Sequence, residues 1–246
     1  MTGLVIILQS ISNYNVSKHY IPDDSIDVTN EEDSTSYSPP AASSYSQNCA
    51  PYRALGVESS AETAARLLFM AVKWAKNLPS FASLAFRDQV ILIEEAWSEL
   101  FLLNAIQWCL PLDAACAALF GSEQADQESG SSSAALRRLR EVLGRYRAVL
   151  VDPAEFACMK AIVLFKSETR GLKDPLQIEN LQDQAQVMLM THARSAHGSA
   201  PARFGRLLLL LPLLRLVSPQ QLEKEFFAKT IGQTPMEKVL ADMYKN

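Results

Sequence analysis

Apolar side chains recur at helical spacing along the chain from about residue 62 to its end. Two such stripes are Leu136, Leu139, Leu143, Tyr146 and Leu150, and Ile178, Leu181, Ala185 and Leu189. Steps of three and four residues place apolar side chains on one face of an α-helix. The sequence has no sustained alternating run and no Asn-Gly or Asp-Gly turn, which are typical marks of paired strands. The pattern therefore predicts an all-α domain.

Four helix starts carry the same four-residue pattern. An oxygen-bearing residue is followed by proline and, three positions later, by Glu or Gln; the quartets begin at Asp152, Asp174, Ser218 and Thr234. The first side chain caps a free amide, proline stands where no amide donor is needed, and the last side chain reaches back to the capping residue. We predict that a helix begins at each of the four positions.

The stretch from Asp88 to Trp108 is apolar on nearly every face. Its apolar residues are Val90, Ile91, Leu92, Ile93, Ala96, Trp97, Leu100, Phe101, Leu102, Leu103 and Ile106. A helix with this pattern needs cover on both sides, so we predict that it lies in the middle of a layered helical domain.

The first part of the chain differs in composition from the rest. Acidic residues between positions 23 and 33 are followed by a stretch rich in Ser, Pro and Tyr, and too few apolar residues are present to offset the entropy of ordering it. We predict that residues 1–60 are a largely disordered segment and linker, and that residues 61–246 form one helical domain. The low-complexity stretch 121–133 is predicted to be a flexible loop.

Composition excludes several classes of protein. A chain of 246 residues that is 48% hydrophobic can fill a core, and its net charge of −4 gives no basic surface for nucleic acid. The four cysteines include no C-x-x-C pair, so a double zinc-finger module is absent from this sequence. The leucine run 207–214 is far shorter than the ~18 residues that suggest a membrane span. We expect a soluble intracellular protein with reduced cysteines and no membrane contact.

The sequence carries no catalytic signature: H-E-x-x-H, G-x-G-x-x-G, Walker A and G-x-S-x-G motifs are all missing. His192 and His197, near a predicted helix end, are interpreted as part of a solvated tail rather than a metal site. Glu94 and Glu95 are adjacent on a helix and diverge, so they do not suggest an acid/base pair. The arginines of the range 137–147 accompany a leucine stripe and indicate a solvated face. We expect no enzyme, cofactor or metal.

The last segment is a short amphipathic helix. After Gly232, apolar side chains recur at i, i+3, i+4, i+7 and i+8, at Met236, Val239, Leu240, Met243 and Tyr244. Such a segment is either the last core helix, which spacing alone favours, or an end-piece that docks in a groove of its own domain and can yield to a partner helix.

Several of these motifs together resemble the nuclear-receptor ligand-binding domains. The signature is Trp74-Ala75-Lys76, Phe81, Leu84, Asp88-Gln89 and Val90-Ile91-Leu92; the range 203–208 with Leu211-Pro212 resembles the dimerisation helix of the family, and the range 226–232 leads into a segment similar to its activation helix. Residues 64–70, Gln107-Trp108 and Asp242-Met243-Tyr244 resemble the tailless and photoreceptor-specific orphan receptors most.

This resemblance implies a three-layer antiparallel helical sandwich with a hydrophobic coregulator groove. Lys76 and Asp242 would sit at opposite ends of the groove, and Val72, Val90 and Ile93 would line it. A docked helix leaves amides unpaired at one end and carbonyls at the other, so an acid suits the first end and a lysine the second. Glu94 stands where the retinoid X receptor has a basic residue, and its charge would weaken activator binding.

The resemblance also gives expectations for ligand and dimer. Trp108 stands where retinoid receptors have an arginine, so a pocket at Trp108, Phe69 and Leu103 would not pair with an anionic ligand and would stay empty. The alternative is a lipid- or hormone-sensing domain with an occupied pocket. Dimerisation, with a second copy or a retinoid X receptor-like partner, would use Phe204, Leu207, Leu208 and Leu211.

The receptor group implies a nuclear transcriptional repressor that recruits coregulators, mainly atrophin-like corepressors, with its terminal helix resting in its own groove. Binding to DNA would need the zinc-finger module, which this chain lacks. Leu8, Ile11 and Tyr14 resemble the A-L-x-x-L-x-x-Y box of atrophins, although Ile7 and Ile11 depart from it. The segment is either a chance hydrophobic end or a box that docks on its own or a neighbouring domain.

Overall fold

The computed structural model describes residues 60–108 and 130–245, and within these ranges every regular element is a helix. The elements are α2 (Ser60–Lys76), α3 (Pro79–Ala82), α4 (Phe86–Gln107), α6 (Gly130–Val149), α7 (Pro153–Leu164), α8 (Pro175–Ala196), α9 (Arg203–Leu210), η2 (Leu211–Leu216), α10 (Pro219–Leu222), η3 (Glu223–Phe227), α11 (Ala228–Ile231) and α12 (Met236–Lys245). The all-α sandwich predicted from the sequence is confirmed.

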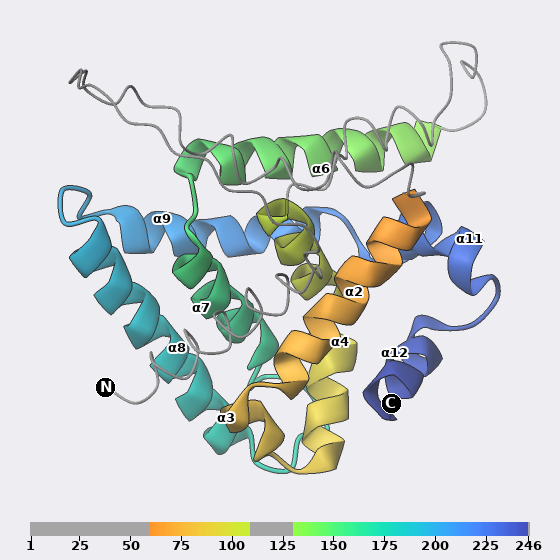
Figure 1. The fold of residues 1–246 in the computed structure, drawn as a ribbon, viewed down its shortest axis with the longest axis horizontal. Helices are drawn as coiled ribbons and strands as arrows, with labels where there is room; N and C mark the ends of the chain where they lie inside the picture. The colour runs from red at the N-terminus through yellow and green to blue at the C-terminus, as the bar shows by residue number, and fades with distance from the viewer. Residues whose placement is uncertain (1–59, 109–129, 246) are drawn as a thin grey trace, which may run out of the picture.

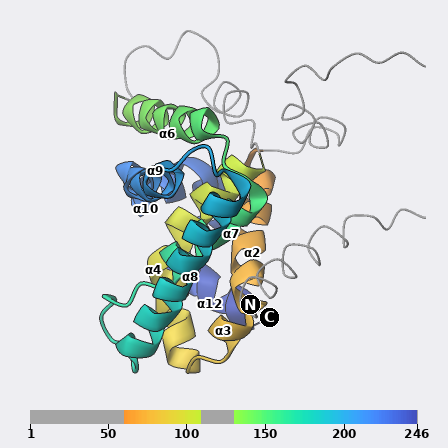
Figure 2. The same cartoon turned by 90° about the vertical axis from the view of Figure 1, so that its left-hand side faces the viewer.

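The helices pack in layers around α4 and α7. Helix α4 contacts α2 on one side and α7 on another, and α7 contacts α8 in turn. Helices α6 and α9 lie across one end of the domain in both Figure 1 and Figure 2. Fifteen residues of α4 are buried, including the polar Asp88, Gln89, Ser98, Glu99 and Asn104, which agrees with the prediction of a middle helix covered on both sides.

The predicted caps coincide with helix starts. Asp152 Oδ1 accepts hydrogen bonds from the amides of Ala154 and Glu155, both at 2.9 Å, and the Asp152 amide donates to Glu155 Oε2 at 2.9 Å. Ser218 forms the same reciprocal box at the start of α10, and Asp174 accepts from the amide of Gln177, the third residue of α8. Helix α12 begins at Met236, two residues after the fourth predicted cap.

Most of the predicted stripe residues whose burial the structure describes are buried, but Leu181 is half-buried and Leu150, at the end of α6, is exposed. Leu139, Leu143 and Tyr146 are in the core, but Leu150 is 54% exposed and has a positive φ of 53°. A left-handed residue ends a helix, so Leu150 turns away from the stripe. Arg203 donates to the carbonyls of Val149 and Leu150, both at 3.1 Å, and satisfies this helix end.

Some predictions fall partly or wholly outside the described residues. The N-terminal segment 1–59, with Leu8, Ile11 and Tyr14, lies outside them, as do residues 121–129 of the predicted loop. Residues 130–133 of that loop instead belong to the first turn of α6. Within the described ranges, no helix is long and apolar enough to cross a membrane.

Candidate functional site

The terminal helix α12 packs on α2 and α4 along its apolar stripe. Met236 and Leu240 are buried, and the rest of the stripe is half-buried. Val72 on α2 and Ile93 on α4 belong to the same buried core cluster as these two residues. The segment therefore packs against the two helices that carry the groove residues expected from the resemblance.

Polar contacts hold the C-terminal end of α12. Lys76 Nζ donates to the backbone carbonyl of Tyr244 at 2.8 Å and lies 5.1 Å from the centroid of its ring. The Tyr244 hydroxyl donates to Gln89 Oε1, and the Tyr244 ring lies 5.5 Å from that of Phe86. Burial raises the pKa of the Tyr244 phenol, so it stays protonated and can act as a donor.

Gln89 is itself held in place. Its Nε2 donates to the carbonyls of Ala82 and Leu84 at 3.1 and 2.8 Å, which leaves Oε1 to accept from Tyr244. The arrangement means that both partners of Tyr244, Lys76 and Gln89, belong to elements that precede it by more than 150 residues. The sequence marked Gln89 only as part of the family signature and did not mark Phe86, because no periodic signal identifies either residue as a neighbour of the chain end.

Lys76 caps the carbonyl end of a helix, as the resemblance implies, but the helix is α12 itself. The last carbonyls of a helix lack internal partners, and a cation near them is favourable. Asp242 is exposed and lies two residues before Tyr244, so it is at the same end of α12 as Lys76. The placement of Lys76 and Asp242 at opposite ends of a coregulator groove stays a prediction, because here Lys76 bonds to the end of α12. Val90 and Glu94 are half-exposed on α4.

The space beside Trp108 is too small for a hormone or lipid. Trp108 lines a cavity of about 20 Å³ together with Met70, Trp74, Asn104 and Lys160, which is room for about one water molecule. Of the other predicted pocket residues, Phe69 is 49% exposed and Leu103 is fully buried in the core, and neither lines this cavity.

A buried lysine borders this cavity. Lys160 Nζ donates to Asn104 Oδ1 at 3.2 Å and Gln107 Oε1 at 3.1 Å, and it lies 4.9 Å from the ring centroid of Trp74. Asn104 is oriented by its own bond to the carbonyl of Leu67. Burial lowers the pKa of Lys160 to about 7. Sequence reasoning missed this residue, although a lysine inside an apolar run was a visible signal.

The predicted dimerisation residues divide into buried and accessible ones. Leu207 is fully buried, so it belongs to the core and cannot meet a partner as the resemblance implies. Phe204, Leu208 and Leu211 are half-buried, and Leu209, which sequence reasoning missed, is 74% exposed. The helical turn places Leu209 outward because its neighbours at Leu207 and Leu210 face the core.

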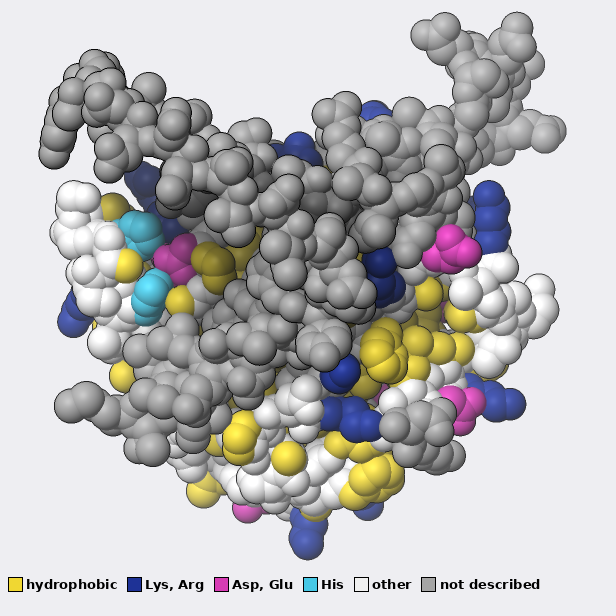
Figure 3. All heavy atoms as spheres, viewed as in Figure 1, with side chains coloured by type: hydrophobic (Ala, Val, Ile, Leu, Met, Phe, Trp, Pro, Cys, Tyr) yellow, Lys and Arg dark blue, Asp and Glu magenta, His cyan; other side chains and the backbone are white. Residues whose placement is uncertain are grey.

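The two histidines are not a solvated tail. His192 Nε2 and His197 Nε2 lie 2.8 and 3.2 Å from the same atom, Asp152 Oδ2. Figure 3 shows two histidine side chains at the surface with an acidic side chain between them. By contrast, the arginines of the range 137–147 are exposed as predicted, and Glu95 beside the half-exposed Glu94 is exposed.

Comparisons with known proteins point to one family. A family model described as the ligand-binding domain of nuclear hormone receptor matches residues 45–231. The chain is 43% identical over 209 residues to the steroid receptor seven-up, isoforms B/C, of Drosophila melanogaster, covering 83% of this chain and 38% of that protein. It is 43% identical over 193 residues to nuclear receptor subfamily 2 group F member 5 of Danio rerio, covering 77% and 48%.

Two further matches agree with these. Nuclear receptor subfamily 2 group F member 6 of Homo sapiens is 42% identical over 193 residues, covering 77% of this chain and 48% of that protein. The solved ultraspiracle ligand binding domain from Drosophila melanogaster matches with a TM-score of 0.60 at 27% identity, covering 75% of this chain and 79% of that one. The chain spans less than half the length of the three curated relatives.

These relatives correct the subgroup expected from the sequence. They are seven-up and group F receptors, and not members of the tailless and photoreceptor-specific group. The motifs that suggested the latter group are short, whereas an identity of 42–43% extends over about 200 residues.

Proposed function

Because the chain belongs to the family of nuclear hormone receptor ligand-binding domains, we propose that it regulates transcription in the nucleus as part of an orphan receptor. The domain is a receptor domain and not an enzyme. The similarity to seven-up and group F receptors supports this subgroup. The alternative of an occupied lipid or hormone pocket needs a volume of roughly 300 Å³ or more, whereas the cavity beside Trp108 holds about 20 Å³.

The domain acts through a coregulator groove that its own α12 covers. The observation that carries this proposal is the bond of 2.8 Å from Lys76 Nζ to the Tyr244 carbonyl, since the same ammonium would cap a visiting helix. A coregulator with apolar residues at i, i+3 and i+4 and α12 would compete for one surface. Activator helices must displace α12, so the resting state does not recruit activators, and corepressors of the atrophin type, which would have to compete with α12 as well, are the expected main partners.

Dimerisation and DNA binding complete the proposal. Leu209, which is 74% exposed, and the half-buried Phe204, Leu208 and Leu211 form an apolar surface that suits a second copy or a retinoid X receptor-like partner. Contact with DNA would be made by a zinc-finger module that is not part of this sequence.

The competition can be measured with a fluorescent peptide that carries an A-L-x-x-L-x-x-Y or L-x-x-L-L box. Removal of residues 234–246 should raise its affinity at least tenfold, because the competing helix is gone. In that shortened chain, Lys76→Ala should weaken binding by about 1–2 kcal/mol, the range for a lost charge-assisted hydrogen bond.

The matched control is Lys73→Ala, which removes an exposed lysine one turn earlier on α2. It should leave the affinity unchanged. If the shortened chain binds both peptides no better than the full chain, α12 is not the competitor; if Lys76→Ala and Lys73→Ala behave alike, the groove assignment is wrong.

A further inference from the structure

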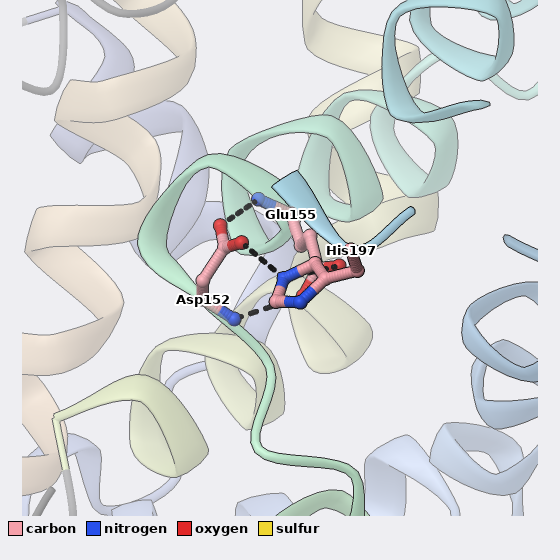
Figure 4. A group of neighbouring side chains, drawn as sticks. All are labelled: Asp152, Glu155 and His197. Atoms are coloured by element: carbon pink, nitrogen blue, oxygen red, sulfur yellow. Dashed lines mark hydrogen bonds and ion pairs between the residues drawn. The ribbon is translucent and has the colours of Figure 1, made fainter. Parts of the chain in front are cut away.

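Metal-ligating side chains meet where α7 begins and α8 ends. Asp152 caps α7, His192 lies in the last turns of α8, and His197 is the residue that ends it. Both Nε2 atoms point at Asp152 Oδ2, at 2.8 and 3.2 Å. Figure 4 shows Asp152 and His197 facing each other with Glu155 beside them. The ligand atoms offered by these three labelled residues all lie within 4.8 Å of one another.

The local backbone explains why the histidines converge. Five residues on a regular helix would place His192 and His197 about 140° apart. His197 instead leaves the helix, with φ −130° and ψ 45°, while its amide still bonds to the carbonyl of Ala193. This change of backbone direction turns its ring to the side of His192, so both rings can reach one carboxylate.

The Asp152 carboxylate uses only one of its two oxygens to cap α7. Asp152 Oδ1 is occupied by the amides of Ala154 and Glu155, which fixes the orientation of the group, and Oδ2 faces the two imidazoles. Burial acts to raise the pKa of Asp152, but the bonds from the Glu155 amide, His192 and His197 outweigh it and hold the pKa below its usual value. The group is therefore an anion at neutral pH.

We propose that Asp152, His192 and His197 bind a divalent transition-metal ion of the zinc type. Two imidazole nitrogens and one carboxylate oxygen are a ligand set that zinc accepts, with a water in the fourth position. Tetrahedral zinc with bonds of about 2.0–2.1 Å holds its ligand atoms roughly 3.3 Å apart. The distances of 2.8 and 3.2 Å from Asp152 Oδ2 to the two Nε2 atoms are close to this spacing, and both imidazole rings are partly exposed.

The surroundings favour a cation without supplying a further ligand. Glu155 is fully buried, and Arg203 Nε and Nη2 donate to its two oxygens at 2.5 and 2.6 Å. Glu155 Oε1 stays 3.8 Å from His197 Nε2, beyond hydrogen-bonding distance. The charges of Glu155 and Arg203 cancel, and Asp152 leaves a net negative charge next to the histidines. Each neutral imidazole can bind the metal by carrying its proton on Nδ1 instead of Nε2.

The test is a titration of Zn²⁺ into the full chain by isothermal calorimetry. We expect one site, and at least a tenfold loss of affinity in each of His192→Gln, His197→Gln and Asp152→Asn. Asparagine keeps an oxygen for the cap of α7, so Asp152→Asn tests the ligand without removing the cap, and circular dichroism checks that each variant is helical.

His19→Gln is the matched control, because His19 is the third histidine of the chain, and it should bind zinc as the parent does. The same titration with Co²⁺ reports the ligand type, since cysteine thiolates give a charge-transfer band in the near ultraviolet and nitrogen and oxygen ligands do not. A chain that does not bind Zn²⁺, equal binding in all variants, or a thiolate band would each overturn the proposal.

Discussion

Helices α7 and α12 have 12 and 10 residues and differ in how much of their surface is covered. Every residue of α7 from Glu155 to Leu164 is buried, whereas among residues 236–244 of α12 only Met236 and Leu240 are. Removing α7 would open the core, whereas we propose that α12, with two buried residues, can leave its site while the rest of the core stays closed. The comparison suggests that coverage, more than length or capping, separates a scaffold helix from one that opens locally at low free energy.

The same substitution in the two helices gives the largest expected contrast. Leu164 and Leu240 are 0% and 1% exposed. Leu164→Ala should lower the free energy of global unfolding by about 2–5 kcal/mol, because it leaves a cavity in the core. Leu240→Ala should lower it by less than ~1 kcal/mol, since α12 detaches before the domain unfolds. Urea unfolding followed by circular dichroism measures both losses of free energy. Equal losses in the two variants would contradict the idea that α7 is part of the scaffold and α12 opens on its own.

A second test concerns Lys160, the lysine that α7 buries in the core. Burial lowers the pKa of Lys160 to about 7, whereas an unfolded lysine titrates near ~10.4. Between these values the unfolded state binds more protons than the folded state, so the free energy of unfolding rises as pH increases from about 7 to about 10. Below pH 7 the lysine is protonated in both states and this slope disappears.

The variant Lys160→Met lacks this titration and keeps a similar volume. From pH 7 to pH 10, the free energy of unfolding of the parent should rise relative to that of the variant by on the order of 3 kcal/mol. Each unit of pKa difference corresponds to about 1.4 kcal/mol. Denaturant unfolding at several pH values measures it. A difference that does not change with pH would show that Lys160 keeps its ordinary pKa in the folded domain.

The contrast also shows what a sequence can predict. The starts of α7 and α10 follow from the quartets at Asp152 and Ser218, because a capping box consists of bonds within four residues. The burial of α4 follows from its own sequence as well, because apolar residues stand on nearly every face of that helix. Leu150 was assigned to a stripe wrongly, because periodicity does not register a residue that turns left-handed to end a helix.

The pairings between helices could not be predicted in this way. Glu155 and Arg203 are 48 residues apart, and Lys76 and Tyr244 are 168 apart. Periodicity says that a face is buried but does not say which element covers it. The groove residues came from a family resemblance, and the histidines were misjudged because Asp152, their partner, lies 40 and 45 residues away.

The smallest expected effect tests what holds α12 in place. Tyr244→Phe removes only the hydroxyl that donates to Gln89 Oε1, while the bond from Lys76 to the Tyr244 carbonyl uses the backbone and remains. A typical net hydrogen bond contributes about 0.5–1.5 kcal/mol, so amide exchange in α12 should become about two- to tenfold faster. Exchange in α7 should not change, because that helix opens only with the core.

Tyr146→Phe is the matched control, since Tyr146 donates its hydroxyl to the carbonyl of Leu210 at 3.2 Å in the interior. Losing that bond should lower the global free energy of unfolding and speed exchange in the most protected amides, α7 included, without a selective effect on α12. Hydrogen exchange followed by mass spectrometry resolves the two helices in one experiment. If both variants change α7 and α12 by the same factor, the two helices open as one unit and α12 cannot yield its surface to a partner by local detachment.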